Sequence, residues 1–212
     1  METVNNLPAT YEEEADNILR AAQEDSGFER LLKFKKGKYF IGDTEVPPGG
    51  EFVAHASQWV KCWIKFANGN VVDRRMGKVA QGFVPSPREG LGDNNESKWE
   101  PGLDGKPKDP WSLQYLLPLE NVENGEVVIF TTASAGGRKG VSDLCKAYGR
   151  HVKKGSHALP IVKLSVGSMP TKAYGDVPRP HFEITGWDEA AAGGIEVIPP
   201  NAASELNDEI PF

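Results

Sequence analysis

Residues 59–66, WVKCWIKF, alternate between two kinds of side chain. Successive side chains of a β-strand point to opposite faces, so a strand here would have two unlike faces. One face is apolar and suits a protein core, with Val60, Cys62, Ile64 and Phe66. The other face interleaves two large aromatic side chains with two cations: Trp59, Lys61, Trp63 and Lys65. Because this pattern is unusual for a strand surface turned to water, the second face is the first candidate for a functional surface.

Further segments have the β-branched and aromatic composition of strands and are bounded by Gly, Pro, Asn or Asp. These strand-like segments are residues 31–42, 51–66, 71–77, 126–132, 160–167 and 181–187. Their number and spacing indicate a protein whose body is built mainly from β-strands.

An Asn-Gly pair at residues 68–69 follows the strand of the two unlike faces. Such a pair is a strong signal for a two-residue hairpin turn. The resulting register places Arg74 opposite Trp63. It also puts Asp73 and Arg75 on the apolar face, so the hairpin needs either a bulge or another register.

Residues 142–154, SDLCKAYGRHVKK, form the most convincing helical segment. Ser142 is expected to be its N-cap, and apolar residues recur along it at helical spacing. The helix falls between the strands predicted at 126–132 and 160–167. A five-stranded Greek-key barrel of the OB type has its helix between strands 3 and 4. The order of elements therefore predicts a mainly β fold, an OB-fold-like Greek-key β-barrel.

Two other segments are predicted to lack regular structure. Residues 84–111 are rich in Pro, Gly and Asp, and a connection of this length in a compact domain is usually functional or flexible. Residues 133–140, ASAGGRKG, are expected to form a flexible turn that carries Arg138 and Lys139.

The net charge of −6 conceals a segregation of charge along the chain. Residues 1–25 carry a net charge of −6 and residues 188–212 carry another −6, so residues 26–187 between them carry +6. A basic body between acidic ends indicates a protein that binds a polyanion, although acidic ends can also simply aid solubility. The predicted parts are an acidic tail or short helix at 1–27, a basic domain at 28–187 and an acidic C-terminal tail.

The chain ends in 207-NDEIPF-212. The small residues, prolines and acids of 188–212 bury too little apolar surface to fold, so this tail is predicted to be disordered. Its ending resembles the acidic tip of bacterial single-stranded-DNA-binding proteins, in which acidic residues precede Ile-Pro-Phe or Leu-Pro-Phe. The likeness in letters covers the last six residues. The order of basic β-rich body, linker and acidic tip is also similar, and the body is most similar to phage or prophage proteins of this kind.

This resemblance implies an OB domain that binds DNA, joined by a flexible linker to a tip that docks into replication, recombination and repair proteins. The residues of the tip are Asp208, Glu209, Ile210, Pro211 and Phe212. A terminal Phe offers a ring for an apolar pocket and a carboxylate for an Arg or Lys of the partner. The two acids would steer the tip toward a basic rim.

The aromatic and cationic strand face suits the same function. Single-stranded DNA exposes base faces and phosphates, and proteins that hold it without reading its sequence place aromatic rings beside cations. The predicted DNA-binding residues are Lys35, Lys36, Lys38, Trp59, Lys61, Trp63, Lys65, Arg74, Arg75, Arg138 and Lys139. The competing interpretation is that the 84–111 connection or a dimer partner covers Trp59 or Trp63, with the lysine stems passing beside the rings.

No convergent set of catalytic, cofactor-binding or metal-ligating residues is found, so the protein is expected to be a non-enzyme that carries no cofactor and no metal. The triplet Glu96-Ser97-Lys98 has a pattern found in some nucleases, but no second acid is placed to share a metal with it. Three alternatives stay open: an RNA-binding module of the same fold, a metal-dependent nuclease or resolvase using loop acids, and a scaffold that acts only through the tip.

The chain contains no apolar run of the length of a membrane span and starts without a secretion signal. A location in the cytoplasm of a bacterium or of a phage-infected cell is therefore expected. Homo-oligomers are compatible with a single barrel and its short binding surface, but no residue decides the oligomeric state.

Overall fold

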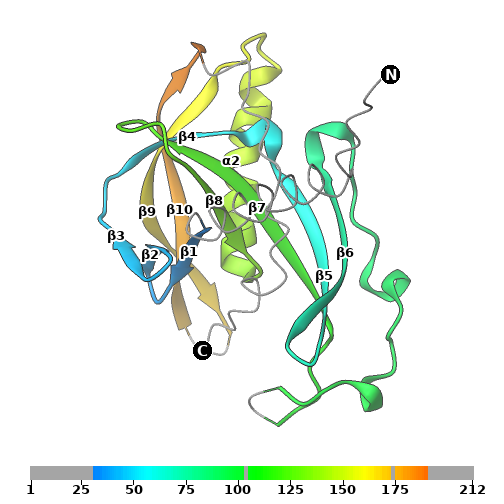
Figure 1. The fold of residues 1–212 in the computed structure, drawn as a ribbon. Helices are drawn as coiled ribbons and strands as arrows, with labels where there is room; N and C mark the ends of the chain where they lie inside the picture. The colour runs from blue at the N-terminus through cyan, green and yellow to red at the C-terminus, as the bar shows by residue number, and fades with distance from the viewer. Residues whose placement is uncertain (1–30, 103–104, 173–174, 191–212) are drawn as a thin grey trace, which may run out of the picture.

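The computed structural model describes residues 31–102, 105–172 and 175–190 (Figure 1). The predicted acidic segment at 1–27 and all but the first three residues of the predicted tail at 188–212 lie outside these ranges. The strands are β1 (Leu31–Lys35), β2 (Lys38–Ile41), β3 (Thr44–Val46), β4 (Glu51–Ala54), β5 (Val60–Ala67), β6 (Asn70–Lys78), β7 (Trp111–Asn121), β8 (Val127–Thr132), β9 (Leu159–Thr171) and β10 (Gly175–Asp188). The described residues also contain one α-helix, α2 (Ala135–Val152), and four short 3₁₀ helices, η1 (Ala56–Gln58), η2 (Val79–Gln81), η3 (Arg88–Leu91) and η4 (Glu96–Lys98).

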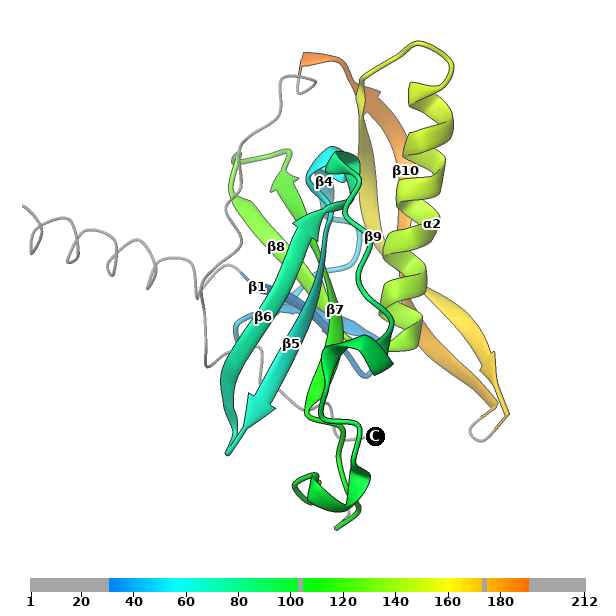
Figure 2. The same ribbon diagram turned by 90° about the vertical axis from the view of Figure 1, so that its right-hand side faces the viewer.

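All of these strands belong to one sheet, in the order β10, β9, β4, β7, β8, β1, β2 and β3, with β5 between β6 and β7. The strand pairs are antiparallel except for β1 and β8, which are parallel. The sheet curls into an open half-barrel, and α2 runs beside β9 and β10 (Figures 1 and 2). The predicted mainly β, OB-like fold is thus confirmed, with the helix between the strands expected at 126–132 and 160–167. The sheet exceeds five strands because the short strands β1 to β3 and the long β9–β10 hairpin extend it.

The curl of the sheet has a local cause in β7. This strand pairs with β8 along one edge and with both β4 and β5 along the other. Pro118 lies within β7 and has no backbone N–H to donate, while its carbonyl accepts a hydrogen bond from the backbone N–H of His55. Opposite this missing donor the neighbouring chain leaves the sheet in η1, which separates β4 from β5. Beyond the break the two strands take different partners, β9 for β4 and β6 for β5.

Two apolar clusters fill the curled sheet. The larger one lies between the sheet and α2 and includes Leu32, Phe52, Phe130, Leu144 and Phe182. The smaller one contains the predicted apolar face of β5, in which Val60, Cys62 and Ile64 are buried, together with Leu31, Leu116 and Ile129. The alternation in the sequence therefore identified the core side of β5 correctly.

A buried tyrosine joins the two ends of the sheet. The hydroxyl of Tyr39 in β2 donates to the backbone carbonyl of Ser165 in β9 at 2.9 Å and accepts from the backbone N–H of His181 in β10 at 3.1 Å. Burial raises the pKa of this hydroxyl, so Tyr39 stays protonated and able to donate.

The helix begins earlier than the sequence suggested. Its N-cap is Ser134, whose hydroxyl accepts from the backbone N–H of Gly137 at 3.0 Å, and Ser142 lies well inside it. The flexible turn predicted at 133–140 is therefore wrong, because most of it is helical. Glycine is a poor helix former, which suggested a turn. Here the missing side chains let α2 approach the sheet: a Cβ at Gly140 would lie 2.5 Å from the carbonyl oxygen of Pro180.

The β5–β6 hairpin contains the bulge that its sequence required. The pairing shifts between Lys65 and Phe66, and Val72 is the extra residue of β6. Trp63 therefore pairs with Arg75, and the predicted pairing of Trp63 with Arg74 is wrong by one residue. The shift brings Arg75 onto the side of the aromatic residues.

The glycines of α2 provide a test of the close approach to β10. We expect Gly140→Ala to lower the free energy of unfolding by about 1–3 kcal/mol, because the added methyl group meets backbone that cannot move away cheaply. Gly149→Ala is the matched control in the same helix, since a Cβ there meets nothing within 4 Å. It should raise stability by up to about 1 kcal/mol. Urea unfolding followed by circular dichroism measures both, and equal effects of the two changes would contradict this packing.

Candidate functional site

The aromatic and cationic side of β5 continues across its two neighbours. Side chains of directly opposed residues lie on the same face of a sheet. Trp63 is opposed by Arg75 in β6 and by Leu113 in β7, and Lys65 is opposed by Asp73 and by Trp111. Lys61 is opposed by Tyr115 in β7. We call this surface the aromatic–cationic face; its members are Trp59, Lys61, Trp63, Lys65, Arg75, Trp111 and Tyr115.

The cations of the face lie over its rings. The ammonium of Lys61 is 4.8 Å from the ring centre of Trp59 and 5.4 Å from that of Tyr115. The guanidinium of Arg75 is 4.8 Å from the ring centre of Trp111. Such cation–π contacts hold the charges in place beside the rings. They also cover Trp111, which is only 4% exposed and cannot take a base on its surface.

The two predicted tryptophans differ in their surroundings. Trp59 is half-buried, packs against the main core and forms an edge-to-face pair with Tyr115 at 5.2 Å. Trp63 is also half-buried, and its indole N–H donates to the carbonyl of Ser86 at 3.0 Å. Trp59 is thus partly a core residue, and the ring of Trp63 is held in place by the connection that the competing interpretation placed over it.

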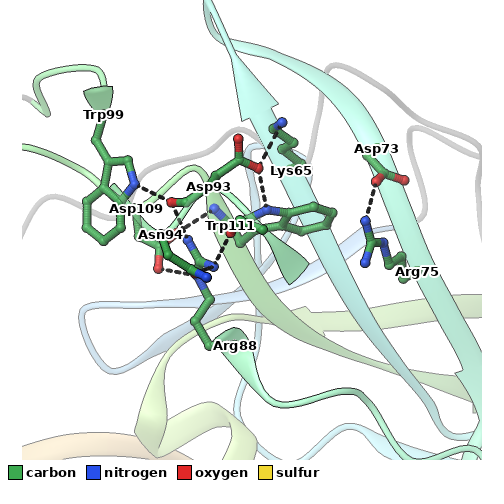
Figure 3. A network of polar contacts seen from close by, with 10 residues as sticks. Lys65, Asp73, Arg75, Arg88, Asp93, Asn94, Trp99, Asp109 and Trp111 are labelled. Carbon is green, nitrogen blue, oxygen red and sulfur yellow. Dashed lines mark hydrogen bonds and ion pairs between the residues drawn. The ribbon is translucent and has the colours of Figure 1, made fainter. Parts of the chain in front are cut away.

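The connection at 84–111 is held by one arginine. The guanidinium of Arg88 makes two hydrogen bonds to the carboxylate of Asp109, at 2.6 and 2.7 Å (Figure 3). It also donates to the carbonyl of Gly92 at 2.7 Å and to the side chain of Asn94 at 3.1 Å. The carboxylate of Asp109 raises the pKa of Arg88. These hydrogen bonds of the Arg88 guanidinium fix the shape of the connection, which among its described residues contains only short 3₁₀ helices before β7.

Asp93 ties the connection to the aromatic–cationic face. Its carboxylate accepts from the ammonium of Lys65 at 2.9 Å and from the indole N–H of Trp111 at 3.0 Å (Figure 3). Its backbone carbonyl accepts from the indole N–H of Trp99 at 2.7 Å. The contacts with Lys65 and Trp111 lower the pKa of Asp93. One aspartate therefore positions two tryptophans and a lysine.

A cleft of about 760 Å³ opens where the end of the β5–β6 hairpin meets the connection. Its lining comes from residues 65–69 of the hairpin and from residues 93–110 of the connection. It contains the rings of Phe66 and Trp99 and three lysines, Lys65, Lys98 and Lys108. The same lining also contains three acids, Asp93, Glu100 and Asp109.

The remaining predicted residues lie elsewhere on the molecule. Arg74 is opposed to Ile64 and so belongs to the other side of the hairpin. The β1–β2 turn carries Lys35, Lys36 and Lys38, and Lys38 pairs with Glu45 at 2.8 Å. Arg138 and Lys139 lie in the first turns of α2, where Lys139 pairs with Asp143. The residues of the tip, 208–212, lie outside the described ranges.

Several residues of this region were not predicted: Arg88, Asp93, Trp99, Trp111 and Tyr115. The signal for the last two was present, because the segment 111–115 alternates as β5 does. Recognising it required knowing that β7 pairs with β5 rather than with β6.

Both cysteines, Cys62 and Cys145, are free thiols. Burial raises the pKa of the Cys62 thiol to about 11 and that of Cys145 to about 12, so both are protonated near neutral pH. Within residues 31–102, 105–172 and 175–190 no three His, Cys, Asp or Glu side chains come together as a group that could hold a metal ion. The helix in these ranges is not long and apolar enough to cross a membrane.

Comparisons with protein-family models, with curated proteins and with solved structures found no match to this chain.

The ion pair of Asp93 gives a pH-dependent prediction. Because folding lowers the pKa of Asp93, the stability that it contributes is present above the ordinary pKa of an aspartate, about 4, and is lost as pH falls through the lowered value. Asp93→Asn should therefore destabilise the protein near neutral pH, and its difference from the wild type should shrink in strong acid. Urea unfolding over a series of pH values measures this difference.

Glu123→Gln is the control, because that side chain is exposed in the β7–β8 turn and has no partner among the described residues. It should match the wild type throughout the series. A difference between Asp93→Asn and the wild type that stays constant into strong acid would contradict the role of the carboxylate.

Proposed function

We propose that the protein binds single-stranded DNA without sequence preference through the aromatic–cationic face and recruits replication, recombination or repair proteins through its acidic tip. The observation that carries the proposal is the line Lys61, Trp63, Lys65 along β5, with Arg75 beside Trp63 on β6. Alternate residues of a strand lie about 6–7 Å apart, a repeat that suits a stretched nucleotide chain.

The contacts of the face suggest which of its residues bind the bases and which bind the phosphates. Trp63 is the ring offered to a base, since Trp111 is buried and Trp59 packs against the core. Lys61, Lys65 and Arg75 flank it, and Lys65 and Arg75 would exchange their ion pairs with Asp93 and Asp73 for contacts with phosphates. Phosphate contacts release counterions from the DNA. Binding should therefore weaken as salt rises. The cation–π contacts hold two of these cations near the rings before DNA arrives, which lowers the cost of ordering them.

The acidic tip is the second part of the proposal and rests on the sequence of residues 208–212. Its ring and terminal carboxylate suit a pocket with a basic rim on another protein. The tip and the face are separate segments of the chain, so DNA binding and partner binding are expected to be separable.

The first test is the affinity for labelled oligo(dT), measured by fluorescence anisotropy with a duplex of equal length as control. Trp63→Ala should weaken binding of the single strand by roughly 5- to 150-fold, since stacking contributes about 1–3 kcal/mol per base. Trp63→Phe keeps a ring but loses the hydrogen bond to Ser86, and it should retain most of the affinity. Equal losses in both variants would show that the hydrogen bond matters and the stacking does not.

Two cation variants locate the DNA further. Arg75→Gln should reduce the slope of affinity against salt, whereas Lys38→Gln should not, because Lys38 begins β2 and does not belong to the aromatic–cationic face. Absence of binding to single strands at low salt would overturn the proposal. Tighter binding of a matched oligo(rU) than of oligo(dT) would instead favour an RNA-binding module.

The tip is tested by Phe212→Ala and by removal of residues 205–212. Both variants should bind oligo(dT) at least as well as the full chain, while losing the bacterial replication and repair proteins captured by the immobilised full chain from a nuclease-treated extract. Asn201→Ala, in the same terminal segment but outside the tip, should leave capture unchanged. Capture that is identical for all variants would contradict the role of the tip.

A further inference from the structure

Hydrogen bonds and an ion pair join the two walls of the cleft beside the hairpin. The backbone N–H of Asn68, in the β5–β6 turn, donates to both carboxylate oxygens of Glu100 at 3.0 and 3.1 Å. The backbone N–H of Phe66 donates to the carbonyl of Pro110 at 2.8 Å. Lys65 pairs with Asp93 across the same junction. Since both walls are joined at these points, the cleft exists before any ligand arrives, and little ordering cost is left for binding.

The acids that line the cleft are already paired within the protein. Asp93 is held by Lys65 and Trp111, Asp109 by Arg88, and Glu100 by the backbone of Asn68. The charges of Asp93 and Asp109 are therefore balanced by cations, while Glu100 keeps its charge and is turned toward the backbone of the hairpin turn.

Two donors in the lining are unused. The ammonium of Lys98 has no partner among the described residues. Asn95 accepts from the backbone N–H and the hydroxyl of Ser97 with its side-chain oxygen, which fixes the orientation of the amide and leaves its NH₂ to donate. The cleft therefore offers a cation for a phosphate and an amide donor for a carbonyl or ring nitrogen of a base.

Trp99 offers the surface on which a base can stack. It is half-buried in the wall, and its indole N–H is bonded to the carbonyl of Asp93, so the ring does not rotate freely. The guanidinium of Arg88 lies 5.8 Å from its ring centre and fixes it further. A ring held in this way stacks a base at little entropic cost.

The cleft also lies in line with the aromatic–cationic face. Along β5 the residues of the face lead from Lys61 through Trp63 to Lys65, and Lys65 and Ala67 are part of the lining of the cleft. Trp63 and Ala67 are four residues apart, a distance of about 13 Å along a strand. A strand of DNA that crosses the face in this direction reaches the cleft about two nucleotides beyond Trp63, at a spacing of about 6–7 Å per nucleotide.

We propose that the cleft holds one nucleotide of the bound single strand, with its base stacked on Trp99 and its phosphate at Lys98. This inference rests on the proposed function. It places one end of the bound DNA strand in the cleft. The cleft adds a binding position beyond the face, so its contribution depends on the length of the oligonucleotide.

The experiment compares Trp99→Leu and Trp99→Phe with the wild type, using labelled oligo(dT) of increasing length and fluorescence anisotropy. Trp99→Leu should weaken binding of the longer oligonucleotides by roughly 5- to 150-fold and should leave the shortest ones, which occupy only the face, unaffected. Trp99→Phe keeps the ring and should bind like the wild type. Lys98→Gln should reduce the salt slope for the longer oligonucleotides by about 0.7, the value for one phosphate contact on a single strand.

The outcomes separate this inference from the proposed function. If the wild type binds oligo(dT) and Trp99→Leu equals it at every length, the cleft holds no nucleotide and the face alone binds. If Trp99→Phe is as weak as Trp99→Leu, the indole N–H supports the wall and the ring does not stack, which also overturns the inference. If the wild type binds no single strand, the proposed function itself fails.

Discussion

A backbone position that cannot donate a hydrogen bond lies where the sheet of this protein divides. Pro118 belongs to the strand on which the curled sheet is centred, and the chain opposite it leaves the sheet for one short turn. The strand on either side of that turn keeps its pairing with β7 but changes its outer partner. The β5–β6 hairpin is thereby directed away from the β9–β10 hairpin, and one side of it receives the aromatic and cationic side chains.

A second level of organisation depends on charge. The connection at 84–111 has almost no regular structure, yet the Arg88–Asp109 pair and the contacts of Asp93 fix it against β5 and β7. These interactions are individually modest at a surface. Together they hold the whole connection in place, because each of them fixes a different part of it. The connection thereby becomes a wall of the cleft and a support for Trp63 and Trp99.

The sequence predicted those features that depend on local periodicity. The alternation at 59–66 identified both faces of β5, and the order of elements predicted a mainly β fold with its helix in the right interval. The features that it missed depend on partners distant in sequence. The glycines of 135–140 are helical where the helix lies close to the sheet, with Gly136 against Arg179 and Gly140 against Pro180. The cations of 35–38 and 138–139 lie off the face because of the order of the strands. The position of Trp99 depends on its contact with Asp93, which no spacing reveals, and that of Trp111 on the pairing of β7 with β5.

The polar contacts of Tyr39 have a consequence for how the chain reaches its native state. Its hydroxyl bonds to β9 and β10, and its neighbour β1 pairs in parallel with β8. The first strands, which pair locally with one another, therefore also depend on partners far along the chain. Mainly β proteins with such distant pairings fold in milliseconds to seconds. The chain must lose the entropy of loop closure before the distant contacts contribute their favourable free energy. During synthesis the outer edge of β1 therefore stays unpaired until β8 has been made, and the contacts of Tyr39 wait for β9 and β10.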